Sequence, residues 1–132
     1  MTSINYAVTF EPFTERHFIR SFAKKYKGAW DFTFSSLRLE FEQIDLLSLK
    51  NSAETIINTK DIKICKTEFK VSGTPYSRHS SGNRCIVAVH KDTKNVRVLL
   101  VYNKTDLSGH NETLEWKSLV RENYPEYKEY CK

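Results

Sequence analysis

The sequence lacks the short motifs by which most cofactor and metal sites are found. No stretch matches GxGxxG, GxxxxGK[ST] or HExxH, and no two of its three cysteines are spaced as CxxC. The cysteines and histidines in the middle of the chain match no zinc template either. An odd number of cysteines argues against a disulfide framework and favours a reducing compartment. We therefore expect no cofactor and no metal ion, with Cys65 and Cys85 as small buried residues and Cys131 as a buried residue or a free thiol.

Long apolar runs are also absent. No stretch approaches the ~18 consecutive apolar residues of a membrane span. The first residues, 1–13, lack the basic and then apolar pattern of a secretory signal. With 132 residues, 39% of them hydrophobic and 13% aromatic, the chain can bury one core. The expectation is a single cytoplasmic domain, 1–132, with no membrane partner.

Positive charge is concentrated in one part of the chain. The segment from Lys60 to Lys104 carries ten Lys and Arg against three acidic residues, whereas the other 87 residues carry eleven basic and thirteen acidic residues. The segment is thus +7 and the rest −2, which together give the overall +5. Such an asymmetry is typical of a surface that binds the phosphates of a polyanion. The plainer alternative is a solvated strand face.

The first part of the chain predicts a strand and two helices. Residues 4–10 alternate in polarity, which indicates a short strand. After Pro12, aromatic and aliphatic residues recur at helical spacing up to Gly28, which ends the first helix. Asp31 is a plausible N-cap for a second helix that runs to Asn51. A helical hairpin follows from this pattern.

The second part predicts three strands and a final helix. From Lys60 the polarity alternates every second residue, then residues 72–83 form a long loop rich in Gly, Ser and Pro. Residues 84–91 and 96–104 form a hairpin of central strands, apolar on both faces. A short acidic helix ends near Pro125. The fold class is α+β: a strand, an α-helical hairpin, three antiparallel strands that complete a four-stranded sheet, and a C-terminal helix.

These strands bring cationic side chains together at one end of the sheet, because Arg84 opens one central strand where Tyr102 and Lys104 close its neighbour. Metal-free RNA cleavage needs a base for the 2′-OH, an acid for the 5′-oxygen and cations for the phosphate. Crowded lysine, arginine and histidine can supply all three, since like-charge repulsion favours the neutral form of a lysine. The blander interpretation is that the lysines keep an edge strand soluble. The candidates are Lys66, Lys70, Arg78, His79, Arg84, Tyr102 and Lys104.

The order of elements, with KTEFKVSGT (66–74) and SGNRCIVAVHKDTKNVRVLLVYNKTD (81–106), resembles the RelE/ParE superfamily of bacterial type II toxins. The resemblance spans roughly residues 4–106 and depends chiefly on Gly82-Asn83-Arg84 and on Val101-Tyr102-Asn103-Lys104. It implies a small domain that binds an antitoxin through a basic concave sheet. RelE-like members are metal-independent mRNA endonucleases that act at the ribosome, so the resemblance implies a toxin that inhibits translation.

The resemblance and the chemistry together assign roles as hypotheses. Arg84 and Arg78 would hold the scissile phosphate, with further RNA contacts from His79, His90 and Arg97. Lys66 or Lys70 would act as the base, Lys104 or His79 as the acid, and Tyr102 would stack on or orient a nucleobase.

Three features depart from the family and leave alternatives open. The loop 72–83 and the second helix are longer than in compact members, and the acidic tail after Asp106 could cover the basic site instead of displaying it. One alternative is a ParE-like noncatalytic inhibitor of DNA gyrase. Another is a basic RNA-binding or protein-binding module without catalysis.

Overall fold

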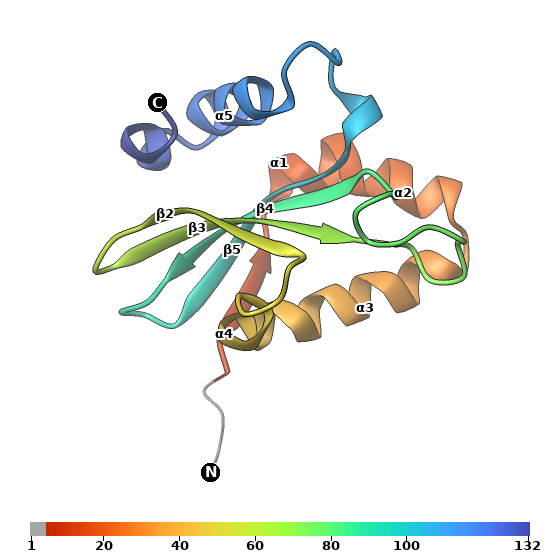
Figure 1. Ribbon diagram of the computed structural model, residues 1–132, viewed down its shortest axis with the longest axis horizontal. Helices are drawn as coiled ribbons and strands as arrows, with labels where there is room; N and C mark the ends of the chain where they lie inside the picture. The colour runs from red at the N-terminus through yellow and green to blue at the C-terminus, as the bar shows by residue number, and fades with distance from the viewer. Residues whose placement is uncertain (1–4) are drawn as a thin grey trace.

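A curved, mixed sheet forms the centre of the molecule, with helices on both of its faces (Figure 1). The computed structural model describes residues 5–132. The sheet has five strands in the order β1-β5-β4-β3-β2; β1 is parallel to β5, and the other neighbours are antiparallel. The elements are β1 (Ala7–Phe10), α1 (Pro12–Thr14), the π-helical segment η1 (Glu15–Ile19), α2 (Arg20–Lys25), α3 (Ala29–Glu42), α4 (Ile44–Leu47), β2 (Ala53–Asn58), β3 (Ile62–Phe69), β4 (Asn83–His90), β5 (Asn95–Asn103), the 3₁₀ turn η2 (Lys104–Asp106), α5 (Glu112–Asn123) and the 3₁₀ segment η3 (Pro125–Tyr130).

The prediction of an α+β chain with a helical hairpin and a C-terminal helix is confirmed, but the prediction of four strands is wrong. The additional strand, β2, pairs antiparallel with β3 at one edge of the sheet. Its two isoleucines are adjacent in the sequence, so the segment shows no alternation of polar and apolar residues. The strand pairing is irregular at the same place, where the register shifts between Thr55 and Ile57. Residue 4, which we placed in the first strand, lies outside the described residues.

The helical hairpin turns where the sequence predicts, at Gly28. That residue has a φ of +83°, a conformation that glycine adopts without steric cost. The next helix, α3, begins directly afterwards at Ala29, so Asp31 lies in its first turn and is not the N-cap. An acidic residue there still favours the helix through its dipole.

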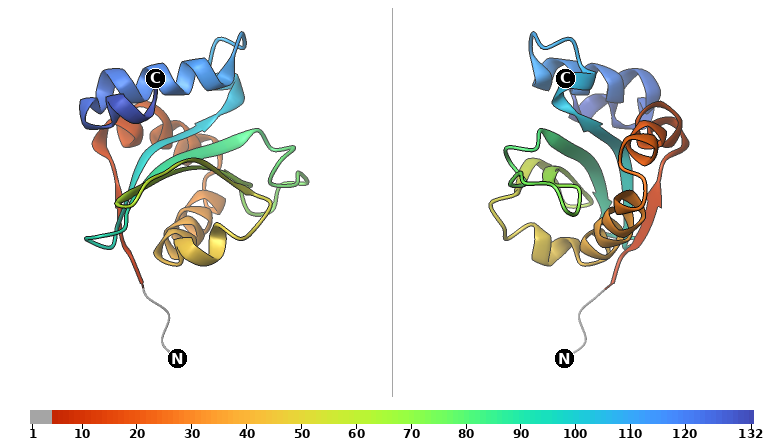
Figure 2. Two further views of the ribbon diagram at one scale, coloured as in Figure 1. Left: turned by 60° about the vertical axis from the view of Figure 1, so that its left-hand side comes forward. Right: turned by 90° about the vertical axis from the view of Figure 1, so that its right-hand side faces the viewer.

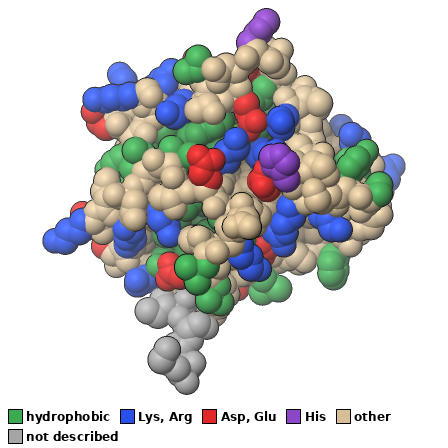
Figure 3. All heavy atoms as spheres, in the orientation of Figure 1, with side chains coloured by type: hydrophobic (Ala, Val, Ile, Leu, Met, Phe, Trp, Pro, Cys, Tyr) green, Lys and Arg blue, Asp and Glu red, His purple; other side chains and the backbone are tan. Residues whose placement is uncertain are grey.

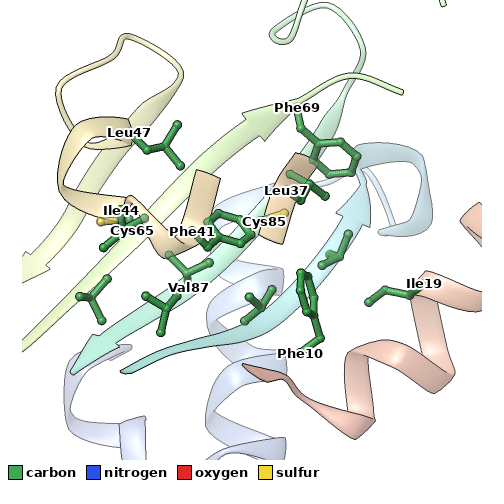
Figure 4. Packing of buried hydrophobic residues seen from close by; sticks show 14 of the residues in the cluster. Phe10, Ile19, Leu37, Phe41, Ile44, Leu47, Cys65, Phe69, Cys85 and Val87 are labelled. Carbon is green, nitrogen blue, oxygen red and sulfur yellow. The ribbon is translucent and has the colours of Figure 1, made fainter. Parts of the chain in front are cut away.

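One face of the sheet packs against the helical hairpin. Aromatic and aliphatic side chains from α3 and α4 meet the inward residues of β3 and β4, as Figure 4 shows for Phe41 and Ile44 beside Cys65, Cys85 and Val87. All five are at most 1% exposed. Cys65 and Cys85 are buried, as expected, and Cys131 is also a buried free thiol.

The other face packs against the C-terminal segment, as the two views of Figure 2 show. Trp116 and Val120 of α5, with Tyr127 of η3, bury side chains from the central strands, including Leu100 and Tyr102. Because both faces are covered, β4 is buried along almost its whole length. The acidic tail therefore covers much of the sheet face on which an open basic surface was expected. No helix in residues 5–132 is long and apolar enough to cross a membrane.

Candidate functional site

A solvent-open hollow of about 340 Å³ lies where the ends of β3, β4 and β5 meet the first turn of α5. We call it the Glu68 hollow. Cationic and acidic side chains alternate around it, and Figure 3 shows Lys and Arg interspersed with Asp and Glu around a histidine on this face. The lining residues are Asn51, Ser52, Glu54, Lys66, Glu68, His79, Arg84, Lys104 and Glu112.

The strand register places the central residues of the hollow side by side. Glu68 of β3 is the direct partner of Arg84 of β4, and Arg84 is the partner of Tyr102 of β5. Lys66 is two residues from Glu68, so both side chains leave the same face of β3. The predicted convergence of Lys66, His79, Arg84 and Lys104 is thus what the fold produces.

Glu68 organises the hollow because the His79 imidazole and the Arg84 guanidinium meet on one of its carboxylate oxygens. Its Oε2 lies 2.6 Å from Nδ1 of His79 and 3.2 Å from Nη2 of Arg84. The Arg84 side chain is 3% exposed and also donates to the carbonyls of Asn83 and His79. The His79 side chain, by contrast, is 81% exposed. A fixed, buried guanidinium therefore stands beside an accessible carboxylate–imidazole pair.

Glu112, the first residue of α5, closes one side of the hollow. Its carboxylate lies 2.9 Å from Nζ of Lys66 and accepts a 2.7 Å hydrogen bond from the hydroxyl of Tyr102. Burial acts against the ionised carboxylate, but these two bonds hold the pKa of Glu112 below its usual range. Burial and the same hydrogen bond raise the pKa of Tyr102. Tyr102 is 0% exposed, so it cannot stack on a nucleobase as expected.

Lys104 is held at the rim by the ends of two strands. Its backbone N–H donates to the carbonyl of Gly82 at 2.9 Å. The side-chain amide of Asn103 bridges the carbonyl of Ser81 and the side chain of Asn83. Lys104 itself forms no ion pair within residues 5–132. This lysine therefore presents an uncompensated charge to the hollow.

The structure places two predicted residues in a second hollow. Lys70 follows the last residue of β3, and its side chain lines a hollow against α3, not the Glu68 hollow. Arg78 lines the same second hollow and forms a bidentate pair with Glu40 of α3, at 2.9 and 3.1 Å. The expectation that all the cations converge in one pocket is wrong for this pair.

His90 and Arg97 lie at the opposite end of the central strands. His90 Nε2 is 2.6 Å from the hydroxyl of Tyr127, and that hydroxyl accepts a hydrogen bond from Nη1 of Arg97. Arg97 also pairs with Glu11 and Glu126, and these bonds raise the pKa of its guanidinium despite burial. Both residues thus tie η3 to the sheet, and His90 lies six strand residues from Arg84, a rise of about 20 Å.

Sequence reasoning missed the acidic members of the site. Glu68 stands between two lysines in an alternating strand, and that position is itself a signal, because an acid on the lysine face must meet the cations there. Glu112 gives no such signal, since only tertiary packing brings α5 to the strands. Acids from outside residues 60–104 pair with Lys66, Arg78 and Arg97. The charge excess of that segment is partly neutralised within the fold.

Similarity to known proteins is found at the level of the fold and not at the level of the sequence. No protein-family model matches the sequence, and no curated protein matches it closely enough to count. A chain in the crystal structure of an archaeal RelE–RelB complex from Pyrococcus horikoshii is structurally similar, with a TM-score of 0.55 and 14% sequence identity. The match covers 99% of that chain and 78% of this one. The protein therefore has a RelE-like fold with additional structure beyond the shared part.

Proposed function

We propose that this protein is a toxin-type endoribonuclease that cleaves mRNA in the cytoplasm and inhibits translation, with the Glu68 hollow as its active site. The observation that carries the proposal is the meeting of His79 and Arg84 on one oxygen of Glu68, in a hollow open to solvent. Such a group contains a base, an acid and a fixed cation within hydrogen-bond reach, which is what phosphodiester cleavage needs.

The proposed chemistry is 2′-O transphosphorylation. The Glu68 carboxylate takes the proton of a ribose 2′-OH, and the 2′-oxygen attacks the adjacent phosphorus. Protonated His79 gives its proton to the departing 5′-oxygen, which leaves a 2′,3′-cyclic phosphate and a free 5′-hydroxyl. Arg84, Lys66 and Lys104 stabilise the negative charge that develops on the phosphoryl oxygens. This assigns the base to Glu68 in place of a lysine, because Lys66 is ion-paired with Glu112.

An antitoxin is the proposed protein partner. The similar archaeal structure is a RelE–RelB complex, and a RelE-like fold in this chain supports a partner that plays the same part. We propose the ribosome as the place of cleavage on the resemblance to RelE-like toxins. The test is to express this protein in a bacterial host with and without the product of a neighbouring gene. Restored growth in the presence of that product would support it as the antitoxin.

The test of catalysis is cleavage of single-stranded RNA by purified protein in the presence of a chelator, with the new ends mapped. His79→Ala should lower the rate about 10²- to 10⁴-fold, the usual contribution of a general acid, and Glu68→Gln should do the same. His110→Ala removes an exposed histidine outside the hollow and serves as the matched control. Undiminished cleavage by both hollow variants would contradict the proposal.

A noncatalytic binding module is the second candidate. It is favoured by the ion pair of Lys66 with Glu112, because a carboxylate already occupies the position where a phosphate would meet that lysine. This candidate predicts salt-dependent binding without any cut RNA. A ParE-like gyrase inhibitor would instead cause DNA damage while transcripts stay intact.

A further inference from the structure

The second hollow, which we call the α3 groove, has about 200 Å³ between α3, the end of β3 and the loop that follows. It contains chemistry that the proposed active site does not use. Its polar lining includes hydroxyls and charged groups, and an aromatic ring stands at its edge. The members that matter are Phe32, Ser36, Glu40, Lys70, Ser72 and Arg78.

The α3 groove and the Glu68 hollow lie on the two sides of one short piece of chain. Glu68 faces the hollow with its carboxylate, while its backbone carbonyl lies 3.5 Å from Nη1 of Arg78. The neighbours Arg78 and His79 divide in the same way: the first lines the α3 groove and the second lines the hollow. Residues 68, 78 and 79 therefore separate two hollows that a single extended polymer could occupy together.

The side chains of the α3 groove suit a nucleotide. Lys70 is exposed and forms no ion pair within the described part of the chain. Arg78 is anchored by Glu40 yet keeps 40% of its side chain exposed. Phe32 is 66% exposed, so its ring is accessible to a ligand in the groove. A free cation beside an exposed aromatic ring is the combination with which proteins bind single-stranded nucleic acid.

We propose that the α3 groove is a second nucleotide subsite, which binds a flanking nucleotide of the single-stranded RNA whose scissile phosphate lies in the Glu68 hollow. Phe32 stacks on the flanking base, and Lys70 binds its phosphate. The inference rests on the proposed function and adds a substrate class to it: single strands long enough to span both hollows. Short oligonucleotides occupy the Glu68 hollow alone.

The experiment measures binding separately from cleavage. The probes are labelled 2′-O-methyl oligonucleotides of about 4 and about 12 nucleotides, within the range of known single-strand sites; they lack the attacking hydroxyl. Phe32→Ala should weaken binding of the longer probe about fivefold, the lower end of a base–aromatic stack, without affecting the shorter probe. Lys70→Ala should lower the slope of log affinity against log salt by about 0.7 for the longer probe, as expected for one lost phosphate contact.

Matched controls are available on the opposite side of the molecule. The exposed fraction of Leu114, 64%, matches that of Phe32, and Lys128 is exposed as Lys70 is. Leu114→Ala and Lys128→Ala should bind both probes as the unmodified protein does. Because Phe32 and Lys70 are exposed, their variants should also keep the unfolding temperature of the unmodified protein.

The outcomes separate the subsite from catalysis. Equal loss of both probes, or no loss of either, in the Phe32 and Lys70 variants would overturn the subsite. Weakened binding of a partner protein by Phe32→Ala, with unchanged oligonucleotide affinity, would also overturn it and make this surface a protein interface. The protein could also bind the longer probe more tightly in a way that depends on Phe32 and yet cut no RNA. That result would support the second nucleotide subsite and contradict the proposal of a nuclease.

Discussion

Glu112 joins the C-terminal helix to the cationic hollow, and its replacement tests that junction. Glu112→Ala removes the only hydrogen-bond partner of the buried Tyr102 hydroxyl in residues 5–132 and the ion-pair partner of Lys66. An unpaired buried hydroxyl costs about 1–3 kcal/mol, and a partly exposed ion pair adds at most about 1 kcal/mol. We expect the free energy of unfolding to fall by about 1–4 kcal/mol in total.

Glu112→Gln separates charge from hydrogen bonding. The amide oxygen can still accept from Tyr102, so the expected loss at pH 7 is only about 1 kcal/mol. Because the pKa of Glu112 is lowered in the folded protein, its ionised form stabilises the fold at every pH above its unfolded pKa of about 4.3. That contribution disappears as the pH falls through the lower, folded-state pKa. The unmodified protein and Glu112→Gln should therefore converge in stability in acid.

Urea unfolding followed by circular dichroism, at pH 7 and again at acidic pH, measures these differences. Glu122→Ala, an exposed position on the same helix, is the control and should change stability by less than about 0.5 kcal/mol. If Glu112→Ala unfolds at the same urea concentration as the unmodified protein at neutral pH, then the junction contributes nothing. A difference between Glu112→Gln and the unmodified protein that stays constant with pH would refute the role of the charge.

Three further predictions concern the same region. Tyr102→Phe should lose about 1–2 kcal/mol of stability, seen in urea unfolding, yet cleave RNA at the unmodified rate, because the ring is buried; a large loss of cleavage would show that the hydroxyl reaches the substrate. Trp116→Ala should lower the free energy of unfolding by about 3–5 kcal/mol, because it leaves a cavity. Trp116→Phe should lower it much less, because a ring still fills the space and the fully buried indole N–H that is lost has no partner among the described residues. Equal losses for the two variants would show that filling this space with a ring does not stabilise the fold. Gly82→Ala should lower the melting temperature by several degrees, about 1–2 kcal/mol, because its φ is +78° and a Cβ would lie 3.3 Å from the Asn103 amide; unchanged melting would contradict this strain.

The sequence predicts the parts of the fold in which local patterns and burial agree. Alternating polarity identifies β3, and apolar runs identify β4 and β5, because these strands pack on one or both faces. Helical spacing identifies the hairpin for the same reason. Edge strand β2 was missed because its residues are only half-buried or exposed and its ladder is irregular. Nothing local distinguishes such a strand from a loop.

The candidate site shows a similar division. Lys66, Arg84 and Lys104 converge because the register of antiparallel strands follows from the pattern of the sequence. Lys70 shares the parity of Lys66, but β3 ends at Phe69, and beyond a strand end parity no longer fixes a direction. The position of Glu112 depends on where α5 lies on the sheet, which is set by contacts between residues distant in sequence. Local patterns carry no information about such contacts.

The pairing of β1 with β5 has a consequence for how the protein is made. Residue 7 is aligned with residue 95, so the sheet cannot close until most of the chain has left the ribosomal tunnel. Contacts this distant in sequence slow folding, because a large loop must be ordered before they form. Synthesis proceeds at about 5–20 residues per second, so the 88 residues that separate residue 7 from residue 95 take about 4–18 s to make. During that interval β1 lacks its partner strand, and a binding partner can meet the incomplete sheet first.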